Sequence, residues 1–392
     1  MDGFLKSVGG AWSSLTEKYP QLTQLEERVV TLLPRLSPEH VIQLGPKRYR
    51  VIRTLGEGGY STVYLVRELS ERSGDLGTAP AEPPGPDLAL KQIFLAGPEE
   101  EQRAAAEVRL LQSLAHPNII RLLESTVTDV DTPSGPRRAA LLLFPAYQHG
   151  SAWDAVHRAA APPPLRTVLS IFIQLCAALE AVHAAGLSHR DVKPQNLLME
   201  ARPGATPRTV LMDLGSAGPA AVPVRDRGHA LELQEEAEAH CTAPYRAPEL
   251  WEVVPGTVLT EKVDVWAAGC VLYCLAYRES PFERATGTTG GSLKLAILNA
   301  RPLHPSGGCT FPEEPKHLAC LQPLIRACLE QDPSRRPSAA EAKLMAQTLL
   351  EEAVRDPVGG LEGAGGPLAH LTARASPVAG LEGTGVAGPG AL

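Results

Sequence analysis

Residues 189–198 read His189-Arg190-Asp191-Val192-Lys193-Pro194-Gln195-Asn196-Leu197-Leu198, and this stretch decides the fold class. It is followed by Asp213-Leu214-Gly215 and, further along the chain, by Ala247-Pro248-Glu249. Taken singly, each of these residues is an ordinary polar or turn-forming group of a loop. Their joint appearance in this order and spacing is the pattern of a site for phosphoryl transfer from a nucleotide.

The polar residues of these motifs match what phosphoryl transfer requires. The reaction needs little covalent help from the protein, so the site must orient the attacking hydroxyl, bind a metal ion and neutralise charge. We expect Asp191 to accept the hydroxyl proton or to orient the hydroxyl, and Lys193 to steady the transferred group. Asn196 and Asp213 offer oxygen ligands for Mg²⁺, a hard ion that keeps several waters.

A glycine-rich segment lies earlier in the chain and reads Leu55-Gly56-Glu57-Gly58-Gly59-Tyr60-Ser61-Thr62-Val63. A glycine turn can lie close over phosphates because no Cβ intervenes, and its amide groups can face anionic oxygens. Alone this evidence is weak, because glycine turns also join ordinary hairpins and Ser61 stands where the usual motif has its third glycine.

The next segment strengthens the interpretation. Leu88-Ala89-Leu90-Lys91 has the form of a buried strand ending in a lysine, which would place an ammonium group on the α and β phosphates of ATP. A helical pattern follows over residues 99–114 and includes Glu107, which can pair with Lys91. The alternative for Glu107 is a solvated helix face, where most glutamates lie.

Composition limits the class of protein. The 392 residues carry a formal net charge of −7 and no long Lys/Arg run, which argues against nucleic-acid binding. Seven cysteines without a C-x-x-C pair indicate reduced thiols rather than a disulfide framework or a zinc site. No stretch approaches the roughly 18 apolar residues of a membrane span, and no secretory signal is visible. We therefore expect a cytoplasmic protein, and a monomer.

The chain divides into three parts by composition. We expect an N-terminal amphipathic helical extension over residues 1–46, a catalytic domain over 47–350 with a disordered insertion at 70–87, and a disordered tail rich in Gly, Ala and Pro over 351–392. The apolar face between Phe4 and Leu15 is expected to pack on the domain or on a partner. The alternative is a membrane-surface helix with Phe4 and Trp12 inserted.

Across roughly residues 49–350 these motifs resemble the eukaryotic protein kinase family. Asp264-Val265-Trp266-Ala267-Ala268-Gly269 looks like the helix that anchors the catalytic loop, and Arg336 resembles the late arginine that pairs with Glu249. Lys193 resembles the serine/threonine kinases, with dual specificity left open. The resemblance implies a bilobal α+β fold with a small antiparallel-sheet N-lobe containing one helix, a larger mainly helical C-lobe, and ATP in the cleft between them.

A closer resemblance is to the Numb-associated kinase family and, within it, to the myristoylated and palmitoylated serine/threonine kinase branch. The segments that carry it are 56–61, 211–216 and 241–250, and the branch shares Ser61 and also Leu214 in place of the commoner phenylalanine. Asp2 stands where the branch's lipid signal needs glycine, so we expect no N-myristoylation. The helix from Phe4 to Leu15 is then a candidate for holding the protein on Golgi or other endomembranes, with a link to membrane trafficking.

The kinase resemblance also implies the nucleotide site. Val63 and Ala89 would enclose adenine with Leu198 beneath it, and Phe144 would be the gatekeeper before a hinge of Pro145, Ala146 and Tyr147. A packed column of Leu111, Leu214 and His189 would link the lobes. The complete set expected at the nucleotide is Leu55, Gly56, Glu57, Gly58, Gly59, Tyr60, Ser61, Val63, Ala89, Lys91, Phe144, Ala146 and Leu198.

The segment before Ala247-Pro248-Glu249 suggests how activity is controlled. No Ser, Thr or Tyr occurs between Ala217 and Cys241, so a conventional phosphorylation site is missing from that stretch. Residues 230–239 are good helix formers, and we hypothesise a helix in which Glu235, Glu236 or Glu238 gives Arg190 a fixed negative partner. The alternative is that these acids only solvate a surface helix. Thr242 is expected to contact the catalytic loop.

Two functions from different classes compete. One is a serine/threonine kinase that uses ATP and Mg²⁺ on protein substrates without an activating phosphorylation. The other is a catalytically dead scaffold, which would usually lack one of the three residues Lys91, Asp191 and Asp213. All three are present, and this favours the enzyme.

Overall fold

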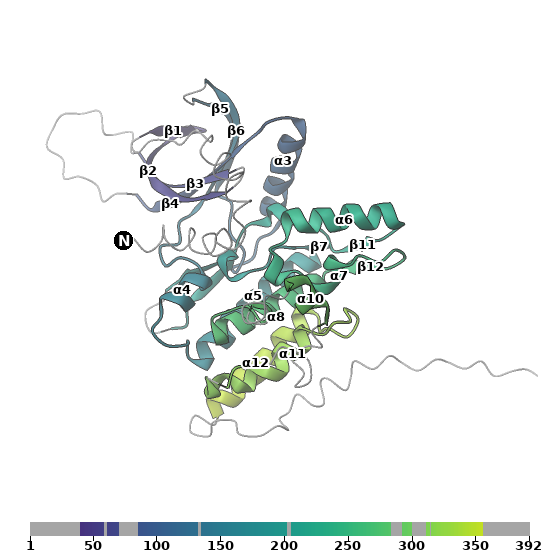
Figure 1. Cartoon of the computed structure of the whole chain (residues 1–392). Helices are drawn as coiled ribbons and strands as arrows, with labels where there is room; N and C mark the ends of the chain where they lie inside the picture. The colour runs from purple at the N-terminus through teal and green to yellow at the C-terminus, as the bar shows by residue number, and fades with distance from the viewer. Residues whose placement is uncertain are drawn as a thin grey trace, which may run out of the picture.

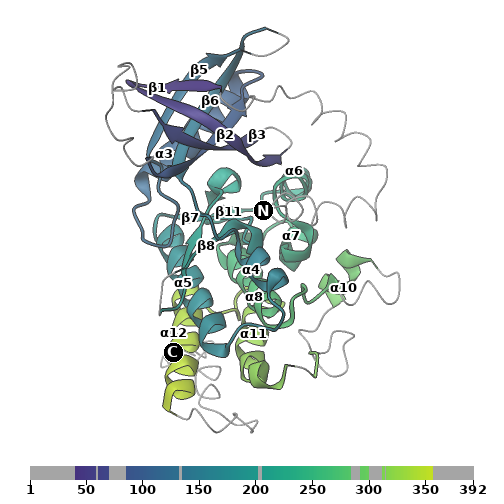
Figure 2. The ribbon, with the colours of Figure 1, turned by 90° about the vertical axis from the view of Figure 1, so that its left-hand side faces the viewer.

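The computed structural model describes residues 40–58, 61–69, 85–131, 135–201, 205–283, 292–299, 311–313 and 315–355. In Figure 1 these residues form a sheet-rich lobe above a mainly helical lobe. Figure 2 shows the same division from the side, with the sheet again above the helices. The predicted bilobal α+β fold is confirmed.

The small lobe is a six-stranded antiparallel sheet with one helix. Its strand order is β1-β2-β3-β4-β6-β5, so only the last hairpin departs from the chain order. The helix, α3 (Pro98–Ser113), follows β4 and covers the predicted helical stretch. The strands are β1 (Val41–Leu44), β2 (Lys47–Gly58), β3 (Ser61–Glu68), β4 (Asp87–Phe94), β5 (Glu124–Val130) and β6 (Arg137–Pro145).

Alternation along β4 gives the sheet two different faces. Leu88, Leu90 and Phe94 are buried on one face, in a cluster with residues of β1, β2 and β6. Ala89 and Lys91 lie on the opposite face because successive strand residues point to opposite sides. The second face is therefore available to a nucleotide.

The predicted boundary at residue 46 is wrong in one respect, because Val41–Leu44 form a strand of the sheet. This segment buries Ile42 and Leu44 in alternation and turns into β2 at Gly45, whose φ is +51°. That turn lies beside β5, where a Cβ on Gly45 would come within 2.8 Å of Glu124 Oε1. Four residues are too short a run to stand out in a sequence.

Two other predicted boundaries, the end of the insertion and the end of the catalytic domain, differ from the structure by a few residues. Asp87, assigned to the insertion, is the first residue of β4, and α12 (Ala339–Arg355) extends past residue 350. The helices predicted near 4–15 and 22–33, most of the insertion, and the tail from residue 356 lie outside the described residues.

The large lobe is built around α8 (Lys262–Tyr277), which is buried on all sides from Val263 onward. It packs against α5 (Leu165–Ala184) and α11 (Gln322–Cys328), and α12 covers α5. A Cβ placed on Gly269 would lie 2.7 Å from the Cβ of Cys328, so α8 and α11 approach closely only because residue 269 is glycine. The remaining helices include α4 (Ala152–Arg158), α6 (Arg227–His240), α7 (Pro248–Trp251) and α10 (Leu293–Asn299).

Among the described residues, α5 is the one helix long and apolar enough to cross a membrane by length and composition. Phe172, Leu175 and Leu179 of this helix are buried, and α8 and α12 pack against it. A helix apolar around most of its circumference is typical of a protein core. We therefore read α5 as the core helix of the large lobe.

Short paired strands position the loops of the cleft. β7 pairs with β10, β8 with β9, and β11 with β12, all antiparallel. Their bounds are β7 (Leu187–Ser188), β8 (Leu197–Glu200), β9 (Arg208–Leu211), β10 (Gly218–Pro219), β11 (Ala221–Pro223) and β12 (Val258–Thr260). The 3₁₀ helices are η1 (Pro194–Asn196), η2 (Leu214–Ser216), η3 (Ala243–Tyr245) and η4 (Lys316–Leu321).

Candidate active site

The loop between β7 and β8 is anchored from below by α8. Asp264, which is 1% exposed, accepts hydrogen bonds from the backbone N–H groups of His189 at 2.7 Å and Arg190 at 2.8 Å. His183 binds the same carboxylate at 2.9 Å. These bonds hold Arg190 at a φ of +67°, a left-handed conformation that costs a non-glycine residue about 1–2 kcal/mol. The predicted anchoring role of residues 264–269 therefore falls on Asp264.

Four of the polar side chains converge directly above this anchor. Asp191 Oδ1 accepts a 2.6 Å hydrogen bond from Thr242 Oγ1, and Asp191 Oδ2 lies 2.7 Å from Lys193 Nζ. Lys193 also donates to Thr242 Oγ1 at 2.9 Å, and Asn196 Nδ2 donates to Asp191 Oδ2 at 3.1 Å. Asp191 is thus a nearly buried carboxylate in a fixed orientation, as a residue that positions or deprotonates a hydroxyl must be.

The predicted pair of Lys91 and Glu107 forms within the small lobe, between β4 and α3. Lys91 Nζ lies 2.8 Å from Glu107 Oε1 and 3.3 Å from Asp213 Oδ1, so Glu107 does not lie on a solvated helix face. Burial alone would lower the pKa of Lys91, but the charges of Asp213 and Glu107 outweigh it and raise that pKa. Lys91 in turn lowers the pKa of Asp213 to about 2. Both groups are therefore charged at neutral pH.

The metal ligands predicted from the sequence fit a hard divalent ion. Asn196 donates its amide N–H to the Asp191 backbone carbonyl at 2.8 Å, which leaves its side-chain oxygen as an acceptor. Asp213 is ionised and its side chain is 44% exposed, so its carboxylate can be reached from the cleft. No cluster of three His, Cys, Asp or Glu side chains suited to a metal occurs in the described part of the chain. Two oxygen ligands suit Mg²⁺, which takes its remaining ligands from phosphates and water.

The described residues of the set predicted to hold the nucleotide lie on or beside strands of the small lobe, except Leu198, which lies in the large lobe. Strand register places Val63 opposite both Gly56 and Lys91, and it places Ala89 opposite Phe144. Leu55 and Glu57 lie in β2, Gly58 ends that strand, and Ser61 begins β3. Ala146 follows β6, and Leu198 lies in β8 and bridges Ser151. Gly59 and Tyr60 lie outside the described residues.

The residues of the predicted column between the lobes are buried. Leu111 of α3 and Leu214 of η2 belong to one apolar cluster, and these two elements are in contact. His189 is fully buried and its Nε2 lies 3.1 Å from the carbonyl oxygen of Met212. The helix α3 and the turn that carries Asp213 are therefore packed against each other.

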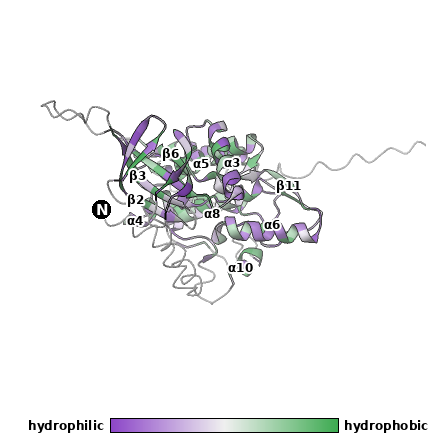
Figure 3. Ribbon diagram, turned by 90° about the horizontal axis from the view of Figure 1, so that it is seen from above, coloured by the Kyte–Doolittle hydropathy of each residue, from purple (hydrophilic) through white to green (hydrophobic). Residues whose placement is uncertain are grey.

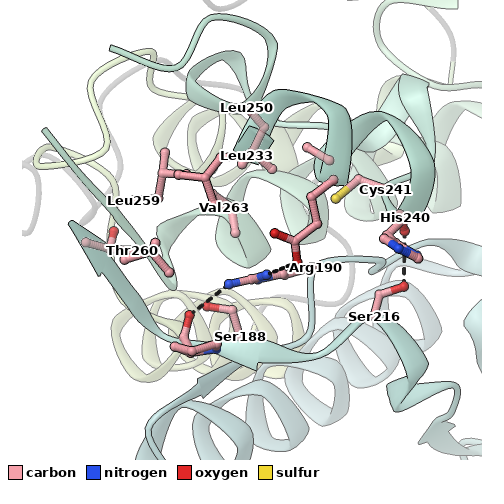
Figure 4. Close-up of a pocket in the computed structure, with 14 residues that line it drawn as sticks. Ser188, Arg190, Ser216, Leu233, His240, Cys241, Leu250, Leu259, Thr260 and Val263 are labelled. Atoms are coloured by element: carbon pink, nitrogen blue, oxygen red, sulfur yellow. Dashed lines mark hydrogen bonds and ion pairs between the residues drawn. The ribbon is translucent and has the colours of Figure 1, made fainter. Parts of the chain in front are cut away.

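The helix hypothesised in the activation segment is α6, and one of its glutamates contacts Arg190. Arg190 Nη1 lies 3.0 Å from Glu236 Oε1, and Arg190 Nη2 donates to the carbonyl of Pro219 at 3.3 Å. Figure 4 shows Arg190 in the pocket beneath this helix. A Cβ on Gly218 would lie 2.5 Å from Arg190 Cζ, so a side chain there would displace the guanidinium.

Two contacts around α6 were not anticipated from the sequence. Ser216, the hydroxyl residue just after Asp213-Leu214-Gly215, donates to the carbonyl of His240 at 3.1 Å (Figure 4). Gly218 lies against Arg190 as described above. A Gly or Ser within a loop carries little signal, because its partner is set by how α6 docks.

The predicted pair of Glu249 and Arg336 forms inside the large lobe. Arg336 Nη1 and Nη2 donate to the two carboxylate oxygens at 2.6 and 2.7 Å, and the Arg336 side chain is fully buried. The guanidinium also lies over the ring of Trp266, 5.1 Å from its centre. This parallel two-bond geometry is the strongest form of an Arg–carboxylate pair.

Three features of the two-lobed structure together define a protein kinase. They are the pair of Lys91 and Glu107, the loop in which Asn196 bonds Asp191, and Asp213, which lies beside Lys91. The protein kinase domain model matches residues 49–347, and the chain belongs to this family.

Similar proteins indicate which kind of protein kinase this chain is. The chain is 34% identical over 294 residues to "Serine/threonine-protein kinase 16" of Homo sapiens and of Rattus norvegicus, covering 74% of this chain and 87% of each relative. It is also 29% identical over 353 residues to "Serine/threonine-protein kinase ppk13" of Schizosaccharomyces pombe, covering 79% of this chain and 94% of that one. The chain is a serine/threonine protein kinase.

Proposed function

We propose that this kinase transfers the γ-phosphoryl group of ATP to serine or threonine of proteins without phosphorylation of its activation segment. The observation that carries the proposal is the 3.0 Å ion pair between Arg190 and Glu236. Many kinases order this segment by adding a phosphate dianion that an arginine near the catalytic aspartate holds. Glu236 offers Arg190 a permanent negative charge instead.

The support of α6 is mostly polar, which makes the ion pair important for its position. Of the 14 residues of this helix only Ala230 and Ala237 are buried, and Figure 3 shows α6 coloured mainly hydrophilic. Polar contacts fix both its ends, since Asp226 caps the first turn and Ser216 holds the last carbonyl. Gln234 accepts a hydrogen bond from the backbone N–H of Val253 at 3.1 Å.

Residues of the chain account for the transfer step. Asp191 orients the substrate hydroxyl and accepts its proton, and Lys193 and Lys91 place positive charge beside the phosphates. Asn196 and Asp213 would hold Mg²⁺, which neutralises charge on the phosphate oxygens when it is bound. Thr242 keeps Asp191 and Lys193 in register through its hydroxyl.

The test uses full-length chain made in bacteria and treated with a phosphatase. With ATP and magnesium it should label serine or threonine of a generic protein acceptor, and Asp213→Ala should abolish labelling. Glu236→Gln should lower kcat about fivefold, the equivalent of about 1 kcal/mol for a half-exposed ion pair. Glu235→Gln, one residue away and exposed, is the matched control and should leave kcat unchanged.

Two outcomes would contradict the proposal in different ways. If the wild-type protein stayed inactive until a second kinase modified it, the proposal that activity needs no phosphorylation of the activation segment would be wrong. A folded protein that binds ATP but transfers no phosphate under any of these conditions would favour a scaffold.

We also propose that the enzyme is a monomeric member of the Numb-associated family that works at the cytoplasmic surface of Golgi or other endomembranes. Support comes from the helical spacing of apolar residues in the sequence between Phe4 and Leu15 and from the resemblance to a lipid-anchored branch. Liposome flotation of the wild type beside a Phe4→Ser, Trp12→Ser double variant tests the membrane contact. Equal flotation of both proteins would refute it.

A further inference from the structure

Asp87 is a charged residue beside the expected hinge, and the kinase motifs assign it no role. It is the first residue of β4, and its side chain is 17% exposed. Its Oδ1 accepts a 2.6 Å bond from Arg67 Nε, and its Oδ2 accepts a 3.0 Å bond from Gln148 Nε2. The two carboxylate oxygens therefore join β3 to the segment after β6.

The backbone of Asp87 makes a third contact with the same segment. The register pairs Leu88 with Pro145, and the Asp87 carbonyl accepts the N–H of Ala146 at 3.3 Å. Side chain and backbone of one residue thus hold both Ala146 and Gln148, which flank Tyr147. This stretch is the expected hinge, whose backbone groups would face adenine.

The far end of the hinge is held independently by the large lobe. Gly150 donates its N–H to the carbonyl of Tyr147 at 3.4 Å, and its own carbonyl accepts the N–H of Met199 in β8 at 2.9 Å. Ser151 follows and caps α4 through its contact with Asp154. Without the Asp87 side chain, the backbone bond to Ala146 and this far end of the hinge would remain, but Gln148 would lose its bond to β4.

Arg67 keeps the carboxylate in place rather than contacting the hinge itself. It lies directly across from Asp87 in the β3–β4 register and is 40% exposed. An exposed pair of this kind contributes little to stability, typically about 0–1 kcal/mol. The pair with Arg67 instead orients the Asp87 carboxylate. Arg67 binds Oδ1, and this leaves Oδ2 pointing toward Gln148.

We propose that Asp87 is a positioning residue of the nucleotide site, which sets the hinge backbone before adenine binds. The inference rests on the proposed use of ATP. A hinge that is already ordered loses less conformational freedom when a ligand binds, so its affinity for the ligand is higher. Asp87 touches none of Lys91, Asp191 or Asp213 by any contact described above, so the chemical step does not depend on it.

The kinetic signature is a change in KM for ATP without a change in kcat. Asp87→Ala should raise KM for ATP about three- to tenfold, the loss of one net hydrogen bond of about 0.5–1.5 kcal/mol. Values of kcat and of KM for the protein acceptor should stay within twofold of the wild type. Asp129→Ala, in the exposed part of β5, is the matched control and should change neither constant.

A double-mutant cycle tests the route through Gln148. Gln148→Leu should reproduce the increase in KM, and the double variant Asp87→Ala, Gln148→Leu should show no further increase, because both changes remove the same bond. Arg67→Met should show a smaller increase. Additive effects of Asp87→Ala and Gln148→Leu would overturn the proposal, as would a fall in kcat equal to the rise in KM.

Binding of a fluorescent ATP analogue to the same variants separates this inference from the proposed function. Weaker binding to Asp87→Ala than to Asp129→Ala, with equal thermal midpoints, supports the positioning role even if no phosphate transfer to protein is seen. Equal binding to both variants refutes it even if the kinase is fully active.

Discussion

Replacing Glu249 with glutamine is expected to destabilise the large lobe, because it leaves the fully buried guanidinium of Arg336 without a counter-charge. Breaking a buried ion pair by removing one partner typically costs about 3–5 kcal/mol. Arg336 keeps three backbone acceptors, the carbonyls of Glu330, Lys262 and Gln331, at 2.6, 2.9 and 3.2 Å. We therefore expect the low end of the range, about 3 kcal/mol.

That cost translates into a measurable shift in the thermal midpoint. An unfolding entropy of about 2.1 cal/mol/K per residue over the roughly 300 residues of the domain gives about 0.6 kcal/mol/K, so the midpoint should fall by about 5 °C. Thermal unfolding followed by circular dichroism or dye fluorescence measures it.

The control is the same substitution three residues further on. Glu252 lies 3.6 Å from Lys294 in a pair whose side chains are 61% and 41% exposed, and such pairs contribute about 0–1 kcal/mol. Glu252→Gln should therefore move the midpoint by less than about 2 °C. If Glu249→Gln shifted it no more than Glu252→Gln does, the attribution of stability to the buried pair would be refuted.

Three further results are expected. Asp264→Asn should lower kcat about 10- to 100-fold, because an amide can accept only one of the two backbone bonds that hold His189 and Arg190, and ³²P transfer at saturating ATP measures it. Thr242→Val should lower kcat about tenfold while Thr242→Ser keeps it, since only the hydroxyl bonds Asp191 and Lys193; equal loss in both variants would disprove this. Burial raises the pKa of Cys241 to about 12, so in the folded protein its thiol stays protonated below that pH. In the unfolded chain the thiol ionises above about pH 9, so the contribution of Cys241 to the free energy of unfolding is lost as the pH rises from about 9 to about 12. Iodoacetamide at pH 8 should therefore spare Cys241 in native protein and label it in guanidinium, as read by peptide mass spectrometry.

Much of the site could be predicted because kinase chemistry fixes residue types at short spacings. Asp191, Lys193 and Asn196 fall within six residues, and the loop that joins them leaves few ways to arrange their side chains. The pair of Lys91 with Glu107 was predicted from the motif set as a whole, and the pair of Arg336 with Glu249 from the family resemblance, because in both cases the partners are too far apart for local spacing to decide.

The remaining features depend on how separate elements dock. The sequence left three glutamates of α6 open as partners of Arg190, because a mostly polar helix gives no apolar stripe to fix which side faces the loop. Only the structure selects Glu236. The partners of Asp87 are 20 and 61 positions away in the sequence, and an insertion separates the first of them, so no local pattern pointed to that residue.

The position of the catalytic loop depends on the distance between α8 and α11, which approach closely at Gly269. Asp264, which holds the loop, lies on the same helix five residues before this glycine, and the helix is buried around its whole circumference. A methyl group at position 269 would have to push α11 away or shift α8, because it would meet Cys328 and Leu329 at 2.7 and 3.1 Å. Asp264 belongs to α8, so a shift of that helix would move the carboxylate that holds the backbone of His189 and Arg190. A glycine, which has no side chain, therefore helps to set the position of the catalytic loop through helix packing alone.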